Sequence, residues 1–304
     1  MTVLKHYNAV NDFIRKSPHI AIYYKNEMIS YDKLYNNVVK YSHILSAMFD
    51  KGDEFYLKMS DRPEYFYIFW GAVKAGIIPH LINPKTTMEL NPFMHVIDDD
   101  NIPDHIAGDD KTDITADTLE NDICFVLYTS GTSGFPQKVP HTHRDMVFTS
   151  INYAKKTILL NAYDITFSAA KLYFAYGFGN SMTFPLFVGA STVLMSEPST
   201  AKNTLDIIEK YKPTVYFGVP SIYAYQLKAK DRDLSSLRLC ISAGEALPGK
   251  IKTEWEEKHN VPILDGIGTT EALHIFISNR PENHEPNCSG IPVSGYKVKI
   301  DAKD

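Results

Sequence analysis

From position 128 the chain reads Tyr128-Thr129-Ser130-Gly131-Thr132-Ser133-Gly134-Phe135-Pro136-Gln137-Lys138-Val139. Apolar, β-prone residues 124–127 precede this stretch, and the residues from Arg144 onwards have a helical pattern. A Thr/Ser/Gly-rich loop between a buried strand and a helix can wrap backbone N–H groups and hydroxyls around phosphate oxygens. The stretch therefore predicts a phosphate-binding loop.

The composition of the loop supports this prediction. Gly131 and Gly134 permit turns and close backbone approach, and Lys138 supplies a positive charge. The spacing differs from the G-x-x-x-x-G-K-[ST] pattern, which argues against a P-loop NTPase. The alternative is a flexible Ser/Gly linker, but the two flanking elements and the absence of low complexity favour phosphate binding.

The overall composition is that of an ordinary globular protein. Hydrophobic residues make up 44% and charged residues 22% of 304 residues, enough for two or three subdomains. The net charge of −5 offers no general affinity for nucleic acid or anionic membranes. No apolar run approaches the ~20 residues of a membrane span, and the N-terminus lacks a signal-peptide pattern. Sparse cysteines (Cys124, Cys240 and Cys288) favour free thiols, so we expect a cytoplasmic protein.

Strand and helix patterns alternate along the chain. A hairpin over 21–29 leads to a helix that Ser30 caps and that runs to Leu45, followed by a strand at 55–57 and a helix at 62–75. Further strands are expected at 165–169, 191–195, 214–218, 237–242 and 262–267. Further helices are expected at 181–187, 204–210, 221–228 and 248–259. This alternation predicts an α/β fold with mixed or parallel sheets and crossover helices.

Four motifs in this order resemble the adenylate-forming (AMP-binding) superfamily, which includes acyl-CoA synthetases. They are the loop above, Ser242-Ala243-Gly244-Glu245-Ala246-Leu247-Pro248, Asp265-Gly266-Ile267-Gly268-Thr269-Thr270-Glu271, and the G-x-P-x-x-G stretch from Gly290 to Gly295. Residues 168–279 are most similar to the benzoate-CoA ligase branch, including residues 169–177 and His274-Ile275-Phe276.

The resemblance implies the large N-terminal domain of the adenylate-forming fold. We expect layered subdomains of mixed and parallel β-sheets at about 1–160 and 161–285, with a third β subdomain beginning at 286–304. In the family, the small C-terminal domain with its catalytic lysine follows the G-x-P-x-x-G motif. Because this chain stops at Asp304, we expect that domain to be absent, through either natural truncation or excision from a longer protein.

The resemblance also implies a two-step reaction. A carboxylate attacks the α-phosphate of MgATP to give acyl-AMP and pyrophosphate, and a thiol, usually that of CoA, then displaces AMP. Lys138, Thr270 and Glu271 would be catalytic, with Glu271 also binding Mg²⁺. The nucleotide would contact two sets of residues, a phosphate cradle and an adenine site. They are Thr129, Ser130, Gly131, Thr132, Ser133 and Gly134 for the phosphates, and Gly244, Glu245, Ala246, Asp265, Gly266 and Ile267 for adenine.

The expected acid is not an α-amino acid. Residues 173–178 contain no carboxylate that could pair with a substrate ammonium, and an unpaired buried charge would be costly. The pocket would be apolar with few polar groups, which suits a benzoate-like or a short to medium aliphatic acid. Its expected lining is Ala175, Tyr176, Gly266, Gly268, His274 and Ile275.

One departure from the family pattern leaves other functions open. The family places a lysine directly after the proline and then a glycine, whereas this chain has Gln137 and then Lys138. The leading hypothesis is an acid–thiol ligase. A second is an acyl-AMP ligase that loads a carrier-protein phosphopantetheine, and a third is a non-catalytic ATP- or AMP-binding domain. A homodimer is an open alternative to a monomer.

Three side chains also have simpler interpretations. Glu271 could be a helix-start carboxylate that complements the helix dipole. His141 and His143 are expected to be solvent-exposed residues at a helix start, and a role near phosphate is the alternative.

Overall fold

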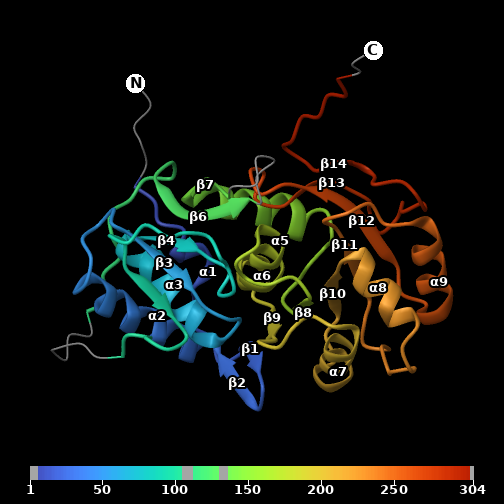
Figure 1. Cartoon of the computed structure of the whole chain (residues 1–304), viewed down its shortest axis with the longest axis horizontal. Helices are drawn as coiled ribbons and strands as arrows, with labels where there is room; N and C mark the ends of the chain where they lie inside the picture. Colours follow the sequence, from blue (N-terminus) through green and yellow to red (C-terminus); the bar gives the residue numbers. More distant parts are fainter. Residues whose placement is uncertain (1–5, 105–111, 130–135, 302–304) are drawn as a thin grey trace.

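Two β-sheets with helices between and around them make up the described part of the chain (Figure 1). The structure is a computed structural model that describes residues 6–104, 112–129 and 136–301. Within these residues, no helix is both long and apolar enough to cross a membrane. The expected α/β fold is confirmed.

The smaller sheet has five strands in the order β5-β3-β4-β6-β7. Its strands are β3 (Glu54–Lys58), β4 (Ile78–Leu81), β5 (Val96–Asp98), β6 (Ile123–Thr129) and β7 (Gln137–Thr142). The first four in the sheet order are parallel, and β7 is antiparallel to β6.

The larger sheet has nine strands in the order β14-β13-β12-β11-β10-β8-β9-β1-β2. Its six central strands are parallel, and the outermost pairings at both ends are antiparallel. The strands are β1 (Ile20–Tyr24), β2 (Glu27–Ser30), β8 (Ile165–Ser168), β9 (Ser191–Leu194), β10 (Val215–Gly218), β11 (Leu239–Ser242), β12 (Ile263–Gly268), β13 (Ile275–Ser278) and β14 (Ile291–Pro292). The β1–β2 hairpin thus belongs to a sheet whose other strands come much later in the chain. The subdomain limits near 160 and 285 stay a prediction.

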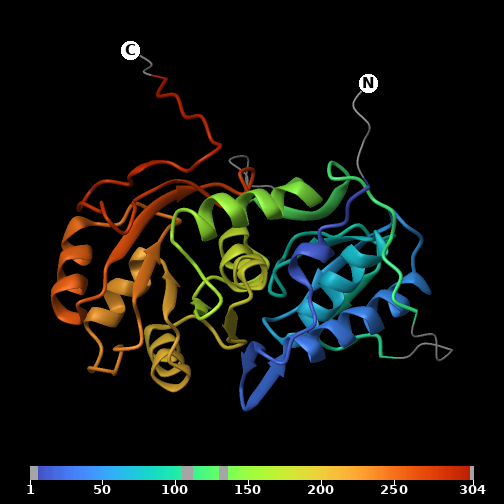
Figure 2. The ribbon, with the colours of Figure 1, turned by 180° about the vertical axis from the view of Figure 1, so that it is seen from behind.

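Most helices lie where the periodicity predicts them. Ser30 caps α2 (Tyr31–Ser46) through its Oγ, which accepts a hydrogen bond from the Lys33 N–H at 3.1 Å. The other outer helices are α1 (Val10–Phe13), α3 (Pro63–Ala75), α7 (Ala201–Tyr211), α8 (Pro220–Leu227) and α9 (Gly249–His259). Viewed from behind, α2 and α3 lie beside the small sheet, and α7, α8 and α9 lie beside the large one (Figure 2).

The helix predicted at 181–187 is longer than expected. It begins at Ala175 and runs through α5 (Ala175–Phe178), the π-helix η2 (Gly179–Thr183) and α6 (Phe184–Val188). Figure 1 shows this run between the two sheets. Its residues 177–186 are all buried, so no amphipathic pattern marks where it begins.

Aromatic side chains pack this central run against the small sheet. Phe178 lies with its ring centroid 4.8 Å from that of Phe125 on β6 and 5.1 Å from that of Phe69 on α3. Phe184 joins a second cluster with Phe217 and Ile241 of the large sheet. The run therefore contributes to the cores of both halves.

The segment after the phosphate loop contains one strand that the sequence did not predict. The chain forms β7, which is antiparallel to β6, and then α4 (His143–Thr149) and the π-helix η1 (Ser150–Lys155), so the helix expected from Arg144 onwards is confirmed. The solvent-exposed interpretation of His141 and His143 is wrong, because both are 2% exposed. The His141 ring stacks on Phe125 at 5.1 Å, and His143 Nδ1 accepts a hydrogen bond from the Ala9 N–H at 3.2 Å.

The contact between α2 and α3 gives a stability prediction. A Cβ added at Gly71 would lie 2.9 Å from backbone and side-chain carbons of Tyr41. We expect Gly71→Ala to lower the free energy of unfolding by about 1–3 kcal/mol, although alanine is the better helix former. Urea denaturation measures this, with Asn36→Ala on the exposed face of α2 as the control, and a stabilised Gly71→Ala protein would contradict the packing.

Candidate functional site

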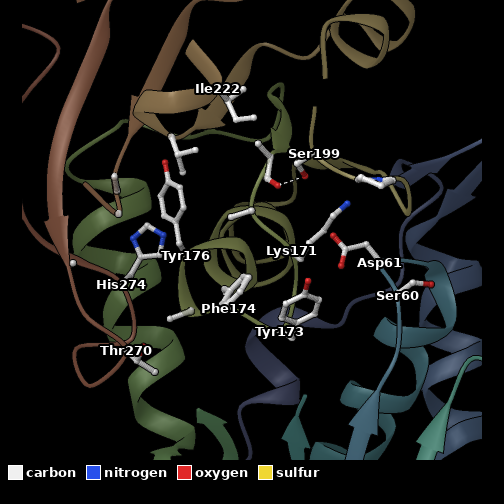
Figure 3. Close-up of a pocket in the computed structure, with 18 of the residues that line it drawn as sticks. Ser60, Asp61, Lys171, Tyr173, Phe174, Tyr176, Ser199, Ile222, Thr270 and His274 are labelled. Carbon is white, nitrogen blue, oxygen red and sulfur yellow. Dashed lines mark hydrogen bonds between the residues drawn. The ribbon is translucent and has the colours of Figure 1, made fainter. Parts of the chain in front are cut away.

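A cavity of about 940 Å³ opens where strands of both sheets end (Figure 3). Ser60 and Asp61 follow β3, Ala169 follows β8, and Ala243 and Gly244 follow β11. Ligands of open α/β sheets bind at these carboxyl ends because the loops that follow the strands meet there. The cavity is therefore the candidate functional site.

One wall of the cavity is apolar and uncharged. Ala175, Tyr176, His274 and Ile275 line it, and Figure 3 shows the Tyr176 and His274 rings side by side. The Tyr176 hydroxyl lies 3.2 Å from the carbonyl oxygens of both Gly218 and Ile241. The hydroxyl donates its single proton to these carbonyl oxygens, so the ring is held in place at the ends of β10 and β11.

His274 is a neutral member of this wall. Its Nε2 lies 3.0 Å from Asn180 Oδ1, and Asn180 Nδ2 donates to Ser168 Oγ at 3.3 Å. This chain of bonds assigns the imidazole proton to Nε2. Burial lowers the pKa of His274 to about 3, because the site offers no charge that would stabilise an imidazolium.

The predicted nucleotide residues lie partly in the same cavity. Gly244, Gly268, Thr269 and Thr270 line it. Glu245 and Ala246 are exposed in the turn after β11 and are not among its lining residues. The positive φ of Gly244, +92°, is a conformation that favours glycine.

Asp265 and its neighbours form the end of β12 beside the cavity. Asp265 Oδ2 accepts a hydrogen bond from Ser289 Oγ at 2.9 Å, and the backbone N–H groups of Leu247 and Gly266 also act on this carboxyl. Burial raises the pKa of this carboxyl. Gly266, which was expected to line the acid pocket, is buried against Ile275 and is not among the lining residues of the cavity, and Ile267 is 45% exposed.

Glu271 does not begin a helix. It is exposed in the turn between β12 and β13, next to Thr270. Among the described residues, no group of three or more His, Cys, Asp or Glu side chains could hold a metal ion. A single carboxylate still fits Mg²⁺ that arrives with a nucleotide, because Mg²⁺ is commonly held by one or two carboxylates, water and phosphate oxygens.

The predicted phosphate loop is only partly described. Thr129 ends β6, whereas Ser130, Gly131, Thr132, Ser133 and Gly134 lie outside the described residues. Lys138 is on β7, with its Nζ 3.9 Å from Glu54 Oε2. Because successive strand residues point to opposite faces, the one-position shift places Lys138 on the face opposite to Gln137.

The other end of the cavity has charged residues that sequence reasoning missed. Asp61 and Lys171 line it, and their side chains lie beside one another in Figure 3. Asp61 is 4% exposed, and its Oδ1 accepts a hydrogen bond from the Leu172 N–H at 3.1 Å. No local pattern around either residue predicts this contact, since 111 positions separate Asp61 from Leu172.

Comparison with known proteins establishes the family. The family model described as AMP-binding enzyme matches residues 92–304. The chain belongs to the AMP-binding enzyme family. This confirms the resemblance drawn from the ordered motifs.

Several relatives in this AMP-binding family act on aromatic acids. The chain is 36% identical to benzoate–CoA ligase of Thauera aromatica over 78% of this chain and 52% of the relative. It is 30% identical to 4-hydroxybenzoate–CoA/benzoate–CoA ligase of Rhodopseudomonas palustris over 98% of this chain and 64% of the relative. The chain thus spans between about half and two thirds of the length of these curated relatives.

A solved structure confirms the fold of the AMP-binding chain. The crystal structure of an anthranilate CoA ligase in complex with anthranoyl-AMP matches it with a TM-score of 0.88 and 32% identity. The match covers 97% of this chain and 66% of that one. The observed sheets therefore correspond to the large N-terminal domain of CoA ligases.

The buried state of His274 predicts a pH dependence of stability. The pKa of His274 falls from 6.5 to about 3 on folding. The contribution of the neutral imidazole to the free energy of unfolding is therefore full above pH 6.5 and is lost as the pH falls toward 3. We expect His274→Asn to reduce the slope of unfolding free energy against pH between 6 and 4 by up to about 1.4 kcal/mol per unit. The exposed His19→Asn control should keep the wild-type slope, and an unchanged slope in His274→Asn would contradict a neutral buried imidazole.

Proposed function

We propose that this chain carries the acid-activating site of an AMP-forming acid–CoA ligase whose substrate is an aromatic carboxylic acid. The main support for this proposal is that one cavity is lined by two sets of residues. One set is an uncharged wall of the size of an aromatic ring, and the other is the glycine and threonine residues of the nucleotide motifs. The relatives named for benzoate and 4-hydroxybenzoate support the same acid class.

The apolar wall favours a benzoate-like acid over an amino acid. Ala175 and Ile275 supply apolar contact, Tyr176 has its hydroxyl engaged, and His274 is neutral. A flat ring fills such a space through dispersion and hydrophobic contact. An ammonium group beside this wall would lack a counter-charge and lose its hydration.

The nucleotide would occupy the other side of the cavity. The exposed backbone at Gly244, with Glu245 and Ala246, would lie along adenine, and Asp265 at the end of β12 would border the other edge of the ring. Gly266 and Ile267 would border the same ring, and Thr270 would donate its hydroxyl to the α-phosphate. The loop from Thr129 to Gly134 would hold the outer phosphates.

Glu271 would hold Mg²⁺ through a carboxylate oxygen, and bound Mg²⁺ neutralises charge on the phosphates. The remaining contribution of the chain is to place the reactants. The carboxylate oxygen attacks the α-phosphorus as the bond to the β-phosphate oxygen breaks, and pyrophosphate leaves with that electron pair. The thiolate of CoA then attacks the acyl carbonyl, and AMP leaves.

Lys138 would serve this reaction only after leaving its contact with Glu54, 3.9 Å away. A half-exposed ion pair of this length is weak, and the lysine stem is flexible. This position is also the observation that favours the non-catalytic nucleotide-binding alternative, because Gln137 stands where the family has its lysine.

Carboxylate-dependent exchange of ATP with pyrophosphate tests the proposal. We expect exchange with benzoate and substituted benzoates, and weaker exchange with fatty acids of increasing length. ATP binding without exchange would instead support the non-catalytic alternative. A chain with neither exchange nor ATP binding would contradict the proposed site, and acyl-AMP that reacts with a carrier protein but not with CoA would favour the carrier-loading alternative.

The proposed metal site gives a sharp test. We expect Glu271→Ala to lower the exchange rate below about one percent of the parent, since loss of a metal clamp removes several kcal/mol of stabilisation. The exposed Glu285→Ala is the matched control and should retain the parent rate. Unchanged exchange in Glu271→Ala would remove this residue from the mechanism.

The size of the acid pocket gives another test of the proposed function. Ala175→Leu adds three carbons to the wall, so we expect kcat/KM for benzoate to fall at least about tenfold through steric exclusion. The KM for ATP should stay within about twofold of the parent, because Ala175 belongs to the acid side of the cavity. If the kinetic constants for ATP were impaired as much as those for benzoate, the variant would instead have a folding defect.

A further inference from the structure

A buried carboxylate at the far end of the cavity connects the two halves of the molecule. Asp61 follows β3 of the small sheet, and the segment 169–174 follows β8 of the large sheet. The Asp61 Oδ1 accepts the Leu172 N–H at 3.1 Å, and both residues are buried. A hydrogen bond from a backbone N–H to an ionised carboxylate is stronger than a neutral one, particularly away from water.

Lys171 strengthens this connection. Its Nζ donates to the carbonyl oxygen of Glu197 at 2.7 Å and to that of Met195, both in the segment after β9. Figure 3 shows the Asp61 carboxylate beside the Lys171 side chain, whose charge lowers the pKa of Asp61. Lys171 thus links the ends of β8 and β9, while its charge also favours the ionised carboxylate of Asp61 in the other half.

The segment held in this way continues into the acid pocket. The Phe174 N–H donates to the Lys171 carbonyl at 3.0 Å, and α5 begins at the next residue, Ala175. A Cβ added at Gly177 would lie 2.1 Å from the Lys171 carbonyl oxygen, so the helix start is in direct contact with this segment. A displacement at Leu172 would therefore be passed on to Ala175 and Tyr176.

We propose that Asp61 is a positioning residue for the acid pocket: together with Lys171 it holds the segment before α5, and so fixes the wall formed by Ala175 and Tyr176. This inference rests on the proposed function, because the wall is the one that would contact the acid. Asp61 itself belongs to the opposite end of the cavity and acts through the backbone at Leu172.

The charges around Asp61 decide how its effect depends on pH. Burial raises its pKa to about 6, and Lys171 and the Leu172 N–H partly counter that rise. Tyr65 on α3 and Tyr173 also face it, and their own pKa values are raised, first by burial and then by Asp61. Glu197 and Lys85 act on Lys171 in opposite directions. Arg62, on the same segment as Asp61, is paired with Glu64 at 2.7 Å.

The pH dependence follows from these charges. Above about pH 6 Asp61 is ionised and accepts the charge-assisted bond, and below it the protonated carboxyl holds Leu172 more weakly. We expect the KM for benzoate to rise about tenfold between pH 7.5 and 5, while the KM for ATP changes less than about twofold. Benzoate stays ionised across this range, since ordinary carboxyl pKa values lie near 4.

Variants separate positioning from general stability. Asp61→Asn should show the high benzoate KM at every pH, and Lys171→Met should move the midpoint of the KM profile to higher pH. The raised pKa means that ionisation of Asp61 costs folding free energy as the pH rises through about 6, so Asp61→Asn should still fold at pH 7.5. The exposed Asp233→Asn control should keep the wild-type profile, and a wild-type profile in Asp61→Asn would overturn the proposal.

An NMR measurement tests the inference even if the chain catalyses no exchange. In Asp61→Asn the amide resonances of Leu172, Ala175 and Tyr176 should shift, whereas those of Gly244 and Thr270 should not. The ¹³C carboxyl signal that disappears in this variant should titrate near pH 6 in the parent and at higher pH in Lys171→Met. Unshifted amides from Leu172 to Tyr176 would overturn the positioning role independently of the proposed function.

Discussion

The helical run over residues 175–188 has to fit between two sheets, and this constraint organises the rest of the molecule. Residues 177–186 are all buried, and added Cβ atoms at Gly177 and Gly179 would collide with the Lys171 carbonyl oxygen and the His274 ring. Phe178 then packs on Phe125 of the small sheet. Close backbone approach and aromatic packing together determine where the first residues of α5, and hence the acid wall, must lie.

The π-helix in the middle of this run has a structural consequence at the site. Wider turns at η2 bring Asn180 opposite His274, where the two side chains bond at 3.0 Å. π-Helical turns occur often at functional sites because they redirect a side chain without ending the helix. Here the Asn180 amide pairs with Nε2 of a buried imidazole, and burial keeps that ring, and with it the proposed acid wall, uncharged.

The cavity gains two different ends from the way the sheets are arranged. Both sheets present the carboxyl ends of parallel strands to the same space, so loops from distant parts of the sequence meet there. One end is uncharged and borders the nucleotide motifs, and the other contains Asp61 and Lys171. The Asp61–Leu172 hydrogen bond at the charged end joins the loops that follow β3 and β8, next to the segment that leads into the proposed acid wall.

The sequence by itself determined the family, the α/β class and the cap of α2 at Ser30, because ordered motifs, alternating patterns and capping are local properties. It also indicated Ala175, Tyr176, Gly268, His274 and Ile275 as neighbours of one pocket, but only through the resemblance. Tertiary structure decided that β7 precedes α4, that His141 and His143 are buried, and that Asp61 meets Leu172. These features depend on contacts between residues far apart in the chain, for which local periodicity carries no information.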